Sequence, residues 1–423
     1  MKFSLGSSWI MRAYRWFAFK SFYFIKNRQH SPINAIGSEK KILVYPAIVS
    51  RDLLADIFKR LSIAFPRSNG FRFFFIVNDD TFKSVSNDVF QNIKNTGHHI
   101  DLLQFQTLKV NDRFTFREFH LILCHQATSL IPLIRHFSRT EIIDSRFFSH
   151  TESLTYQRSY FKLLPHDRKQ HLRDRSINNF RTLCNKLKNK RVGYCLLTGP
   201  SVNNVKSLPV PDDAIKIICN SLVKNTALLE HLNGPDIITF ADPVFHFGAS
   251  DYAFAFRSSM IEVVRKYHSF VVVPEFTLPL ILSWFPELEN YVIGIETVEG
   301  DFCLPASDRL SVKATDNILT MLMLPLAATF SDEIYIAGAD GREEKETYFW
   351  KFNPESQFDK EMKSVFKWHP SFFRDRNYNK YYHAHIHQLE EQIKWLEDKG
   401  KSIQSLTSSM IPALAKRTNI YKT

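Results

Sequence analysis

The chain has 423 residues and carries 55 Lys and Arg against 43 Asp and Glu, a formal net charge of +12. Hydrophobic residues make up 44% and charged residues 23%, which is ordinary for a globular protein and excludes a disordered chain, a collagen and a coiled coil. At about 150 residues per domain, this length indicates two or three domains.

The amino-terminal segment, residues 9–26, is basic and aromatic and contains no acidic residue (WIMRAYRWFAFKSFYFIK). On a helix, its basic side chains fall within a sector of about 140°, and apolar side chains lie opposite. We therefore expect residues 1–30 to be an amphipathic segment that either docks as a helix on the first domain or binds an anionic membrane surface through residues 9–26. A cleaved signal peptide is the remaining alternative.

Several other features are missing from the sequence. No run of about 18 apolar residues occurs, so we expect no membrane-spanning helix. The basic residues are spread out and no nucleic-acid motif is present, so no nucleic-acid partner is expected. The five cysteines include no C-x-x-C pair, which favours reduced thiols and a cytoplasmic setting over a disulfide framework or a thiolate zinc site.

From residue 40 to about residue 150, short β-rich runs alternate with helical patterns. Strands are expected over 41–47, 71–77, 100–105 and 119–125, and helices over 51–65 and 81–95. This alternation predicts βαβ units, so residues 40–150 are expected to form an N-terminal α/β domain with a mostly parallel sheet. The charge-dense stretch over 151–190 is expected to be a connecting helical segment with a solvated face.

A second alternation covers residues 191–416. Strands are expected over 191–199, 215–220, 237–242, 269–276, 291–297, 333–340 and 402–407, with helices near 221–232, 252–267, 316–329 and 385–399. The pattern predicts an α/β, doubly wound, mostly parallel Rossmann-like sheet. The chain has no P-loop, no G-x-G-x-x-G fingerprint, no H-E-x-x-H motif and no G-x-S-x-G motif.

Polar residues follow the first three strands of this second region. Because ligands bind outside the carboxyl ends of open parallel sheets, these residues are candidate contacts. The turn Gly199-Pro200-Ser201 could present backbone N–H groups to a phosphate. Asn220 offers a donor and an acceptor to a base or a ribose, and Asp242 could accept a ribose hydroxyl. Each position could instead be ordinary turn chemistry.

The order of these turns, G-P-S, then C-N, then [N/D]-P, then E-I-Y-I-x-G-x-D at residues 333–340, resembles bacterial sialyltransferases of glycosyltransferase family 42. It also resembles 6-hydroxymethylpterin diphosphokinase-like proteins that share the Rossmann-like domain. The resemblance covers roughly residues 191–416. It implies metal-independent transfer of a sialic-acid-like sugar from a CMP-activated donor to an acceptor glycan, without a cofactor.

The resemblance also implies which residues contact the nucleotide. The family's N-G-P-S turn falls on residues 198–201, with Thr198 in place of its Asn, and the family's second Asn falls on Asp242. The family's Ser/Thr-Gly loop before a long helix falls near residues 315–317, where the glycine is absent. The expected nucleotide contacts are Gly199, Pro200, Ser201, Asn220, Asp242, Thr315, Asn317 and Asp340.

The expected catalytic residues follow the fourth motif. Tyr348 matches a family tyrosine that donates a hydrogen bond to the departing phosphate in place of a metal, and Arg342 could add positive charge there. The family's base, a His before the final helix, falls on His383 or His385, of which His383 is favoured because it is expected to lie in the loop. A neutral His suits removal of a hydroxyl proton near pH 7.

Other interpretations stay open. The H-x-H-x-H run at residues 383–387 could be a metal site or a polar helix start, and His246 is better explained as a core or loop histidine. The Ser/Thr run over 405–409 could contact the nucleotide or cap a helix.

Two other functions are also compatible with the residues. The first is pyrophosphoryl transfer to a pterin-type alcohol, which needs Mg²⁺ and convergence of Asp242, Asp316 and Asp340. The second is a non-catalytic nucleotide- or glycan-binding protein of a surface-polysaccharide pathway. In the favoured interpretation, the amphipathic segment holds the enzyme near a lipid-linked acceptor on the cytoplasmic face of the membrane.

Overall fold

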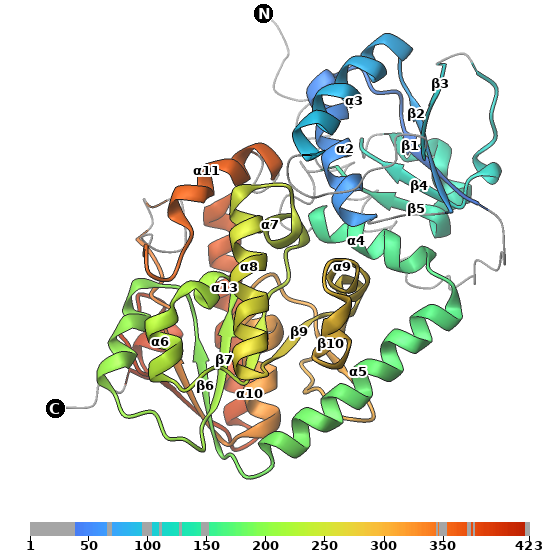
Figure 1. Cartoon of the computed structure of the whole chain (residues 1–423). Helices are drawn as coiled ribbons and strands as arrows, with labels where there is room; N and C mark the ends of the chain where they lie inside the picture. Colours follow the sequence, from blue (N-terminus) through green and yellow to red (C-terminus); the bar gives the residue numbers. More distant parts are fainter. Residues whose placement is uncertain are drawn as a thin grey trace, which may run out of the picture. The chain divides into compact units, whose positions relative to one another are not determined.

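The computed structural model describes residues 39–65, 70–94, 104–109, 112–126, 129–144, 152–343, 346, 353–369, 374 and 377–418. The segment expected over residues 1–30 and the expected catalytic Tyr348 lie outside the described residues. The chain folds as an α/β protein and divides into two compact units, residues 1–165 (unit 1) and 166–423 (unit 2) (Figure 1). None of the helices in the described ranges is both long enough and apolar enough to cross a membrane.

Unit 1 contains a five-stranded parallel sheet with the order β3-β2-β1-β4-β5. Its strands are β1 (Lys40–Tyr45), β2 (Phe71–Ile76), β3 (Phe105–Leu108), β4 (Leu121–Cys124) and β5 (Thr140–Ile142). The connecting helices are α2 (Arg51–Ala64), α3 (Asp79–Lys94) and α4 (Glu152–Leu163), with shorter turns η2 (Phe116–Glu118) and η4 (Ile131–Arg139). Most of the strand expected over 100–105 lies outside the described residues, and the described β3 begins at Phe105.

Phenylalanine side chains fill the core of unit 1 between α2, α3 and the sheet. Phe58 of α2 lies at the centre, with ring centroids 4.8 Å from Phe75 and 5.2 Å from Phe105. Phe73 stacks on Phe105 at 5.1 Å. Aromatic pairs at these separations stabilise the fold beyond the contribution of the apolar area that they bury. Many of the phenylalanines of unit 1 therefore pack in its hydrophobic core.

Unit 2 contains an eight-stranded, all-parallel sheet with the order β11-β10-β9-β8-β7-β6-β12-β13. Its strands are β6 (Val192–Leu196), β7 (Ile215–Cys219), β8 (Ile237–Thr239), β9 (Phe270–Pro274), β10 (Val292–Val298), β11 (Ser311–Lys313), β12 (Glu333–Ala337) and β13 (Ser402–Ser405). β7 and β9 are buried along their whole length, as expected for parallel strands covered on both faces. The prediction of a Rossmann-like α/β sheet is confirmed; the three-residue strand β11 was not predicted.

Helices and short helical turns cover the eight-stranded sheet. The α-helices are α5 (His166–Leu187), α6 (Thr226–His231), α7 (Pro243–Phe247), α8 (Asp251–Tyr267), α9 (Leu278–Trp284), α10 (Leu324–Phe330), α11 (Asp359–Trp368), α13 (Tyr378–Glu397) and α14 (Pro412–Ala415). The 3₁₀ turns are η5 (Pro200–Ser207), η6 (Asn220–Lys224), η7 (Glu275–Thr277) and η8 (Pro286–Asn290), and η9 (Leu319–Met323) is a π-helical turn that leads directly into α10.

The charge-dense segment over residues 151–190 contains helices α4 and α5. One stripe of α5 is buried against β10, where the Ser176 hydroxyl accepts a hydrogen bond from the Gly294 N–H at 3.0 Å. Its charges also have partners: Arg173 makes a two-bond ion pair with Glu275, both bonds 2.8 Å long. α5 is therefore a helix of unit 2 that packs through one buried stripe, and most of its other residues form the expected solvated face.

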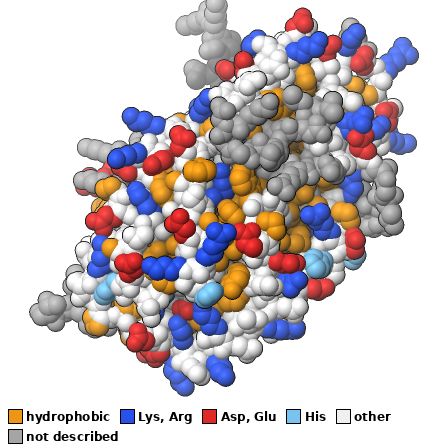
Figure 2. Space-filling view, in the orientation of Figure 1, with side chains coloured by type: hydrophobic (Ala, Val, Ile, Leu, Met, Phe, Trp, Pro, Cys, Tyr) orange, Lys and Arg blue, Asp and Glu red, His pale blue; other side chains and the backbone are white. Residues whose placement is uncertain are grey.

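The net positive charge is not gathered in one place on the face shown in Figure 2. Blue Lys and Arg side chains alternate there with red Asp and Glu side chains. On α8, Arg265 forms an ion pair with Glu287 at 2.9 Å, and Lys266 forms one with Glu230 at 3.0 Å. All five cysteines are free.

Candidate functional site

The direction in which successive strands are added to the eight-stranded sheet reverses at β6. The candidate site lies at the carboxyl ends of the strands next to this reversal. The chain runs outward from β6 through β7 and β8 to β11, and then crosses to β12 on the other side of β6. Ligands in open parallel sheets bind beside such a reversal, at the carboxyl ends of the strands. We call the residues that follow β6, β7, β8 and β12 the carboxyl-edge site. It comprises Gly199–Ser201, Asn220, Asp242, Asp340 and Arg342.

The turn after β6 is closed against the turn after β12. The Gly199 N–H donates to the Gly338 carbonyl at 3.0 Å. The Ser201 N–H donates to Asp340 Oδ2 at 3.0 Å, and the Ser201 hydroxyl donates to Asp340 Oδ1. A Cβ added to Gly199 would lie 2.4 Å from the Gly338 oxygen, so this close approach requires glycine.

This closure changes the role expected for the Gly-Pro-Ser turn. Pro200 has no N–H, and the Gly199 and Ser201 N–H groups are already donated within the protein. A carboxylate thus occupies the position where the turn was expected to receive a phosphate. The expected mechanism, free N–H groups around a phosphate, is not present here, and the turn instead fixes the position of Asp340 and the chain that follows it.

The turn after β13 supports the same region. The Thr407 hydroxyl accepts the Gly338 N–H at 3.2 Å, the Ser409 hydroxyl donates to the Ala339 carbonyl at 2.6 Å, and the Met410 N–H donates to the Asp340 carbonyl at 2.7 Å. The Ser/Thr run over 405–409 therefore braces the chain between β12 and Arg342.

Arg342 is a buried cation without a charged partner in the described part of the chain. The residue is 5% exposed, and its Nη2 donates to Asn379 Oδ1 of α13 at 2.7 Å. The guanidinium carbon lies 4.7 Å from the Tyr382 ring centroid, and the Arg342 N–H donates to the Tyr382 hydroxyl at 3.1 Å. Nη1 is also buried, and it has no hydrogen-bond partner among the residues that the structure describes. A buried donor without a hydrogen bond lowers the stability of the fold. A ligand that accepts a hydrogen bond from Nη1 would therefore stabilise this site.

Asn220 follows β7 as the first residue of η6 and has a strained backbone conformation. Its φ is +49°, in the left-handed region that few residues other than Gly, Asn and Asp adopt. Its side-chain amide forms no hydrogen bond with any described residue. Such outliers are common at ligand sites, so Asn220 keeps both the position and the free polar group expected of a base or ribose contact.

Asp242 is more constrained than expected for a ribose contact. Oδ1 accepts the N–H groups of Val244 and Phe245 at the start of α7, at 2.9 and 3.0 Å, and Oδ2 lies 2.8 Å from His369 Nε2. Burial alone would raise the pKa of Asp242, but the charge and hydrogen bond of His369, with the Phe245 N–H, hold it well below its usual range. Both oxygens therefore already have protein donors.

The histidines of α13 lie on two different faces. α13 begins at Tyr378, capped by the Asn377 side chain, so the expectation that His383 lies in a loop is wrong. His383 is exposed, with its ring centroid 6.4 Å from that of Tyr382. His385 is 3% exposed, and burial lowers its pKa to about 4.

The alternative of an H-x-H-x-H metal site does not fit this helix. At 100° per residue, His385 points away from His383 and His387, and His387 lies 3.5 Å from Glu391. In the described ranges, no cluster of three His, Cys, Asp or Glu side chains could hold a metal ion.

Thr315 and Asn317 stabilise the start of η9. The Asn317 side chain accepts the Leu319 N–H at 2.9 Å, and the Thr315 and Thr320 hydroxyls are 2.8 Å apart. The neighbouring Asp316 carbonyl accepts the Tyr381 hydroxyl of α13. The Asp316 carbonyl thus links the start of η9 to α13. A contact of Thr315 or Asn317 with a nucleotide stays a prediction.

Three residues of the site were missed from the sequence: His369, Asn379 and Tyr382. Each contacts a carboxyl-edge residue that is 37 to 127 positions away along the chain. No short motif marks such pairs. The one local signal was Asn377, a typical helix N-cap, which would have placed Asn379 and Tyr382 on a helix.

The chain was compared with family models, curated proteins and solved structures, and none of them matches it. The function is therefore argued from the geometry of the site.

Proposed function

We propose that the chain is a glycosyltransferase that binds a nucleotide-activated sugar at the carboxyl-edge site. The observation that carries this proposal is the buried Arg342, with an unpaired guanidinium nitrogen beside the reversal of the sheet. A buried cation is stabilised when an anion reaches it, and guanidinium groups bind phosphate oxygens well. A phosphate of the nucleotide is the anion we assign to Arg342.

Asn220 and Arg342 follow two strands whose carboxyl ends lie close together in the sheet. β7 and β12 flank β6, so their ends are two strand spacings apart, about 10 Å. A nucleotide can bridge that span, with its base or ribose at the free Asn220 amide and its phosphate at Arg342.

The carboxylates of the site favour transfer without a metal over the pyrophosphoryl alternative. Asp340 accepts two hydrogen bonds from Ser201, and Asp242 accepts from α7 and His369. Both are thus held by protein donors, whereas the fixed positive charge at the site comes from Arg342. The resemblance to the sialyltransferases supplies the donor class, a CMP-activated sialic-acid-like sugar, and an acceptor glycan.

The proposed reaction is a single displacement. An acceptor hydroxyl oxygen forms a bond to the anomeric carbon while the bond from that carbon to the phosphate oxygen breaks. The electron pair of the broken bond stays on the phosphate, whose charge Arg342 stabilises. His383, exposed beside Tyr382, takes the hydroxyl proton, whereas buried His385 has a structural role. Residues 9–26 would hold the enzyme at the cytoplasmic face of a membrane.

The test is release of CMP from CMP-N-acetylneuraminic acid in EDTA, with lactose as acceptor. The full chain should release CMP faster than the uncatalysed reaction. Arg342→Gln should slow release at least about 10-fold, and Arg181→Gln, an exposed residue of α5, should not. No release above the uncatalysed rate, or release only with Mg²⁺, would contradict the proposal.

A non-catalytic nucleotide-binding protein is the second candidate. It is favoured by the closed Gly199–Ser201 turn, because that turn no longer offers N–H groups to a second phosphate or a leaving group. CMP binding without CMP release in the same assay would favour this candidate.

A further inference from the structure

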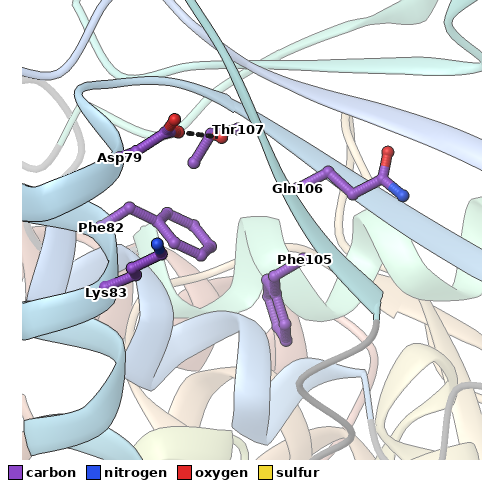
Figure 3. Close-up of a pocket in the computed structure, with 6 residues that line it drawn as sticks. All are labelled: Asp79, Phe82, Lys83, Phe105, Gln106 and Thr107. Carbon is purple, nitrogen blue, oxygen red and sulfur yellow. Dashed lines mark hydrogen bonds between the residues drawn. The ribbon is translucent and has the colours of Figure 1, made fainter.

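Unit 1 contains a pocket that is separate from the carboxyl-edge site. The pocket has a volume of about 410 Å³ and lies between the first turns of α3 and strand β3 (Figure 3). Its lining residues are Asp79, Phe82, Lys83, Phe105, Gln106 and Thr107. This volume is within the range of small-ligand sites.

The apolar part of the pocket is part of the aromatic core. Phe82 of α3 and Phe105 of β3 both pack on Phe58, with ring centroids 5.3 and 5.2 Å away. Phe105 also stacks on Phe73. Because these rings are held by several neighbours, the pocket has an apolar floor that is already ordered before any ligand arrives.

The polar part of the pocket is a fixed carboxylate and a free ammonium group. The Thr107 hydroxyl donates to Asp79 Oδ1, which orients the carboxylate at one end of the pocket (Figure 3). Lys83 lies one helical turn after Asp79, and its ammonium group has no hydrogen-bond partner among the described residues. The Gln106 side chain points to the other side of β3 (Figure 3).

These groups do not suit a phosphate. Asp79 and Asp80 both lie in the first turn of α3, so negative charge surrounds the start of the helix. The N–H groups of Asp80 and Thr81 already donate to the Asn78 side chain, at 2.9 and 3.4 Å. The N–H groups of Asp80 and Thr81 are therefore not available to a phosphate, and the positive charge of Lys83 is offset by the carboxylate of Asp79.

The same groups suit a ligand with hydroxyl groups around an apolar face. A carboxylate accepts O–H donors, an ammonium donates to hydroxyl oxygens, and an aromatic floor packs against C–H groups. A neutral sugar ring has this combination. We propose that the unit 1 pocket binds a neutral sugar ring, held by Asp79 and Lys83 over Phe82 and Phe105.

The identity of the sugar as part of the acceptor glycan rests on the proposed transferase function, whereas binding itself does not. Binding is therefore measured without any nucleotide. The probes are methyl β-D-galactopyranoside, methyl β-D-glucopyranoside, methyl α-D-mannopyranoside and N-acetylglucosamine. Each is titrated to about 10 mM, since a single sugar ring is expected to bind in the millimolar range. The readout is saturation transfer from the full chain to the ring protons of the sugar.

At least one of the four sugars should give saturation transfer. Asp79→Asn should weaken its binding at least about 10-fold, in line with the loss of a charged hydrogen-bond acceptor, and Thr107→Val should weaken it too. The matched control is Asp80→Asn, which removes the same charge from the same helix turn but does not line the pocket. Its signal should remain that of the native chain.

The proposal is overturned if none of the four sugars gives a signal, or if Asp79→Asn and Asp80→Asn lose it equally. Displacement of a bound sugar by CMP in Arg342→Gln would instead assign the pocket to nucleotides and also overturn it. Arg342→Gln should bind the sugar normally. Loss of CMP binding there, with sugar binding kept, separates failure of the carboxyl-edge site from failure of this pocket.

Discussion

Replacing Arg342 with Met separates ligand binding from folding. Without ligand, the substitution removes the hydrogen bond to Asn379 (2.7 Å) and the contact with the Tyr382 ring (4.7 Å), together about 2 to 5 kcal/mol. It also removes a buried guanidinium whose Nη1 is unpaired, which relieves about 1 to 3 kcal/mol for that donor and a further desolvation cost. These effects oppose each other, so the free energy of unfolding should change by less than about 2 kcal/mol.

With CMP present, the two proteins should differ. A hydrogen bond from Arg342 to phosphate contributes about 2 kcal/mol, so its loss weakens binding roughly 30-fold. At a CMP concentration of about 100 times the native Kd, binding stabilises the native chain by about 2.7 kcal/mol. The same concentration stabilises Arg342→Met by only about 0.9 kcal/mol.

The assay is thermal unfolding in EDTA over a CMP series, with Arg181→Met as the control on an exposed arginine. The control should keep the full stabilisation by CMP. If Arg342→Met is stabilised by CMP as much as the native chain, Arg342 does not hold the phosphate. If Arg342→Met loses more than about 4 kcal/mol without ligand, Arg342 is a structural residue and the reasoning about its unpaired nitrogen fails.

Four further predictions concern other parts of the chain. Asp340→Asn should lower the free energy of unfolding in urea by about 1 to 3 kcal/mol, because Ser201 loses a charged acceptor; a loss no larger than that of exposed Asp308→Asn would contradict the closed turn. Burial lowers the pKa of His246 and of His385 to about 4, so between pH 6.5 and about 4 the unfolded chain binds protons that the folded chain does not. The free energy of unfolding should therefore fall as the pH falls through this window. His385→Gln should make this fall less steep, whereas exposed His387→Gln should not. An unchanged fall in His385→Gln would refute the conclusion that His385 is buried in its neutral form. His383→Ala should lower CMP release at least about 10²-fold while His387→Ala leaves it unchanged; an active His383→Ala with an inactive His385→Ala would move the base by two residues. Deleting residues 1–30 should release the protein from anionic liposomes, and undiminished co-sedimentation would refute membrane attachment through residues 9–26.

The parallel sheets were predictable because their strands are buried on both faces. Runs such as LILC in β4 and FVVVP in β9 are continuous apolar stretches, and helical patterns separate them. β5 and β11, three residues each, carry too little sequence to show a period. α13 was placed seven residues too late because its first turns hold Tyr and His rather than a clear apolar stripe.

The residues of the site were predictable one by one, but their partners were not. Strand ends identified Ser201, Asn220 and Asp242 as candidates, since parallel strands present their carboxyl ends at one edge. Whether their polar atoms are free depends on contacts distant in sequence, such as Asp340 with Ser201, 139 positions apart. Because of that contact, the Ser201 N–H binds Asp340 and is not free for a phosphate.

Asn220 offers the most direct test of the central claim, that a nucleotide binds at the carboxyl edge of the eight-stranded sheet. The measurement is calorimetric titration of the full chain with CMP in EDTA. The matched control is Asn233→Ala, because Asn233 has the same left-handed backbone (φ +55° against +49°) but is an exposed residue before β8.

We predict that CMP binds the native chain and Asn233→Ala with equal affinity, and binds Asn220→Ala at least about 10-fold more weakly. Equal binding to Asn220→Ala, or binding of ATP with Mg²⁺ but not of CMP, would contradict it.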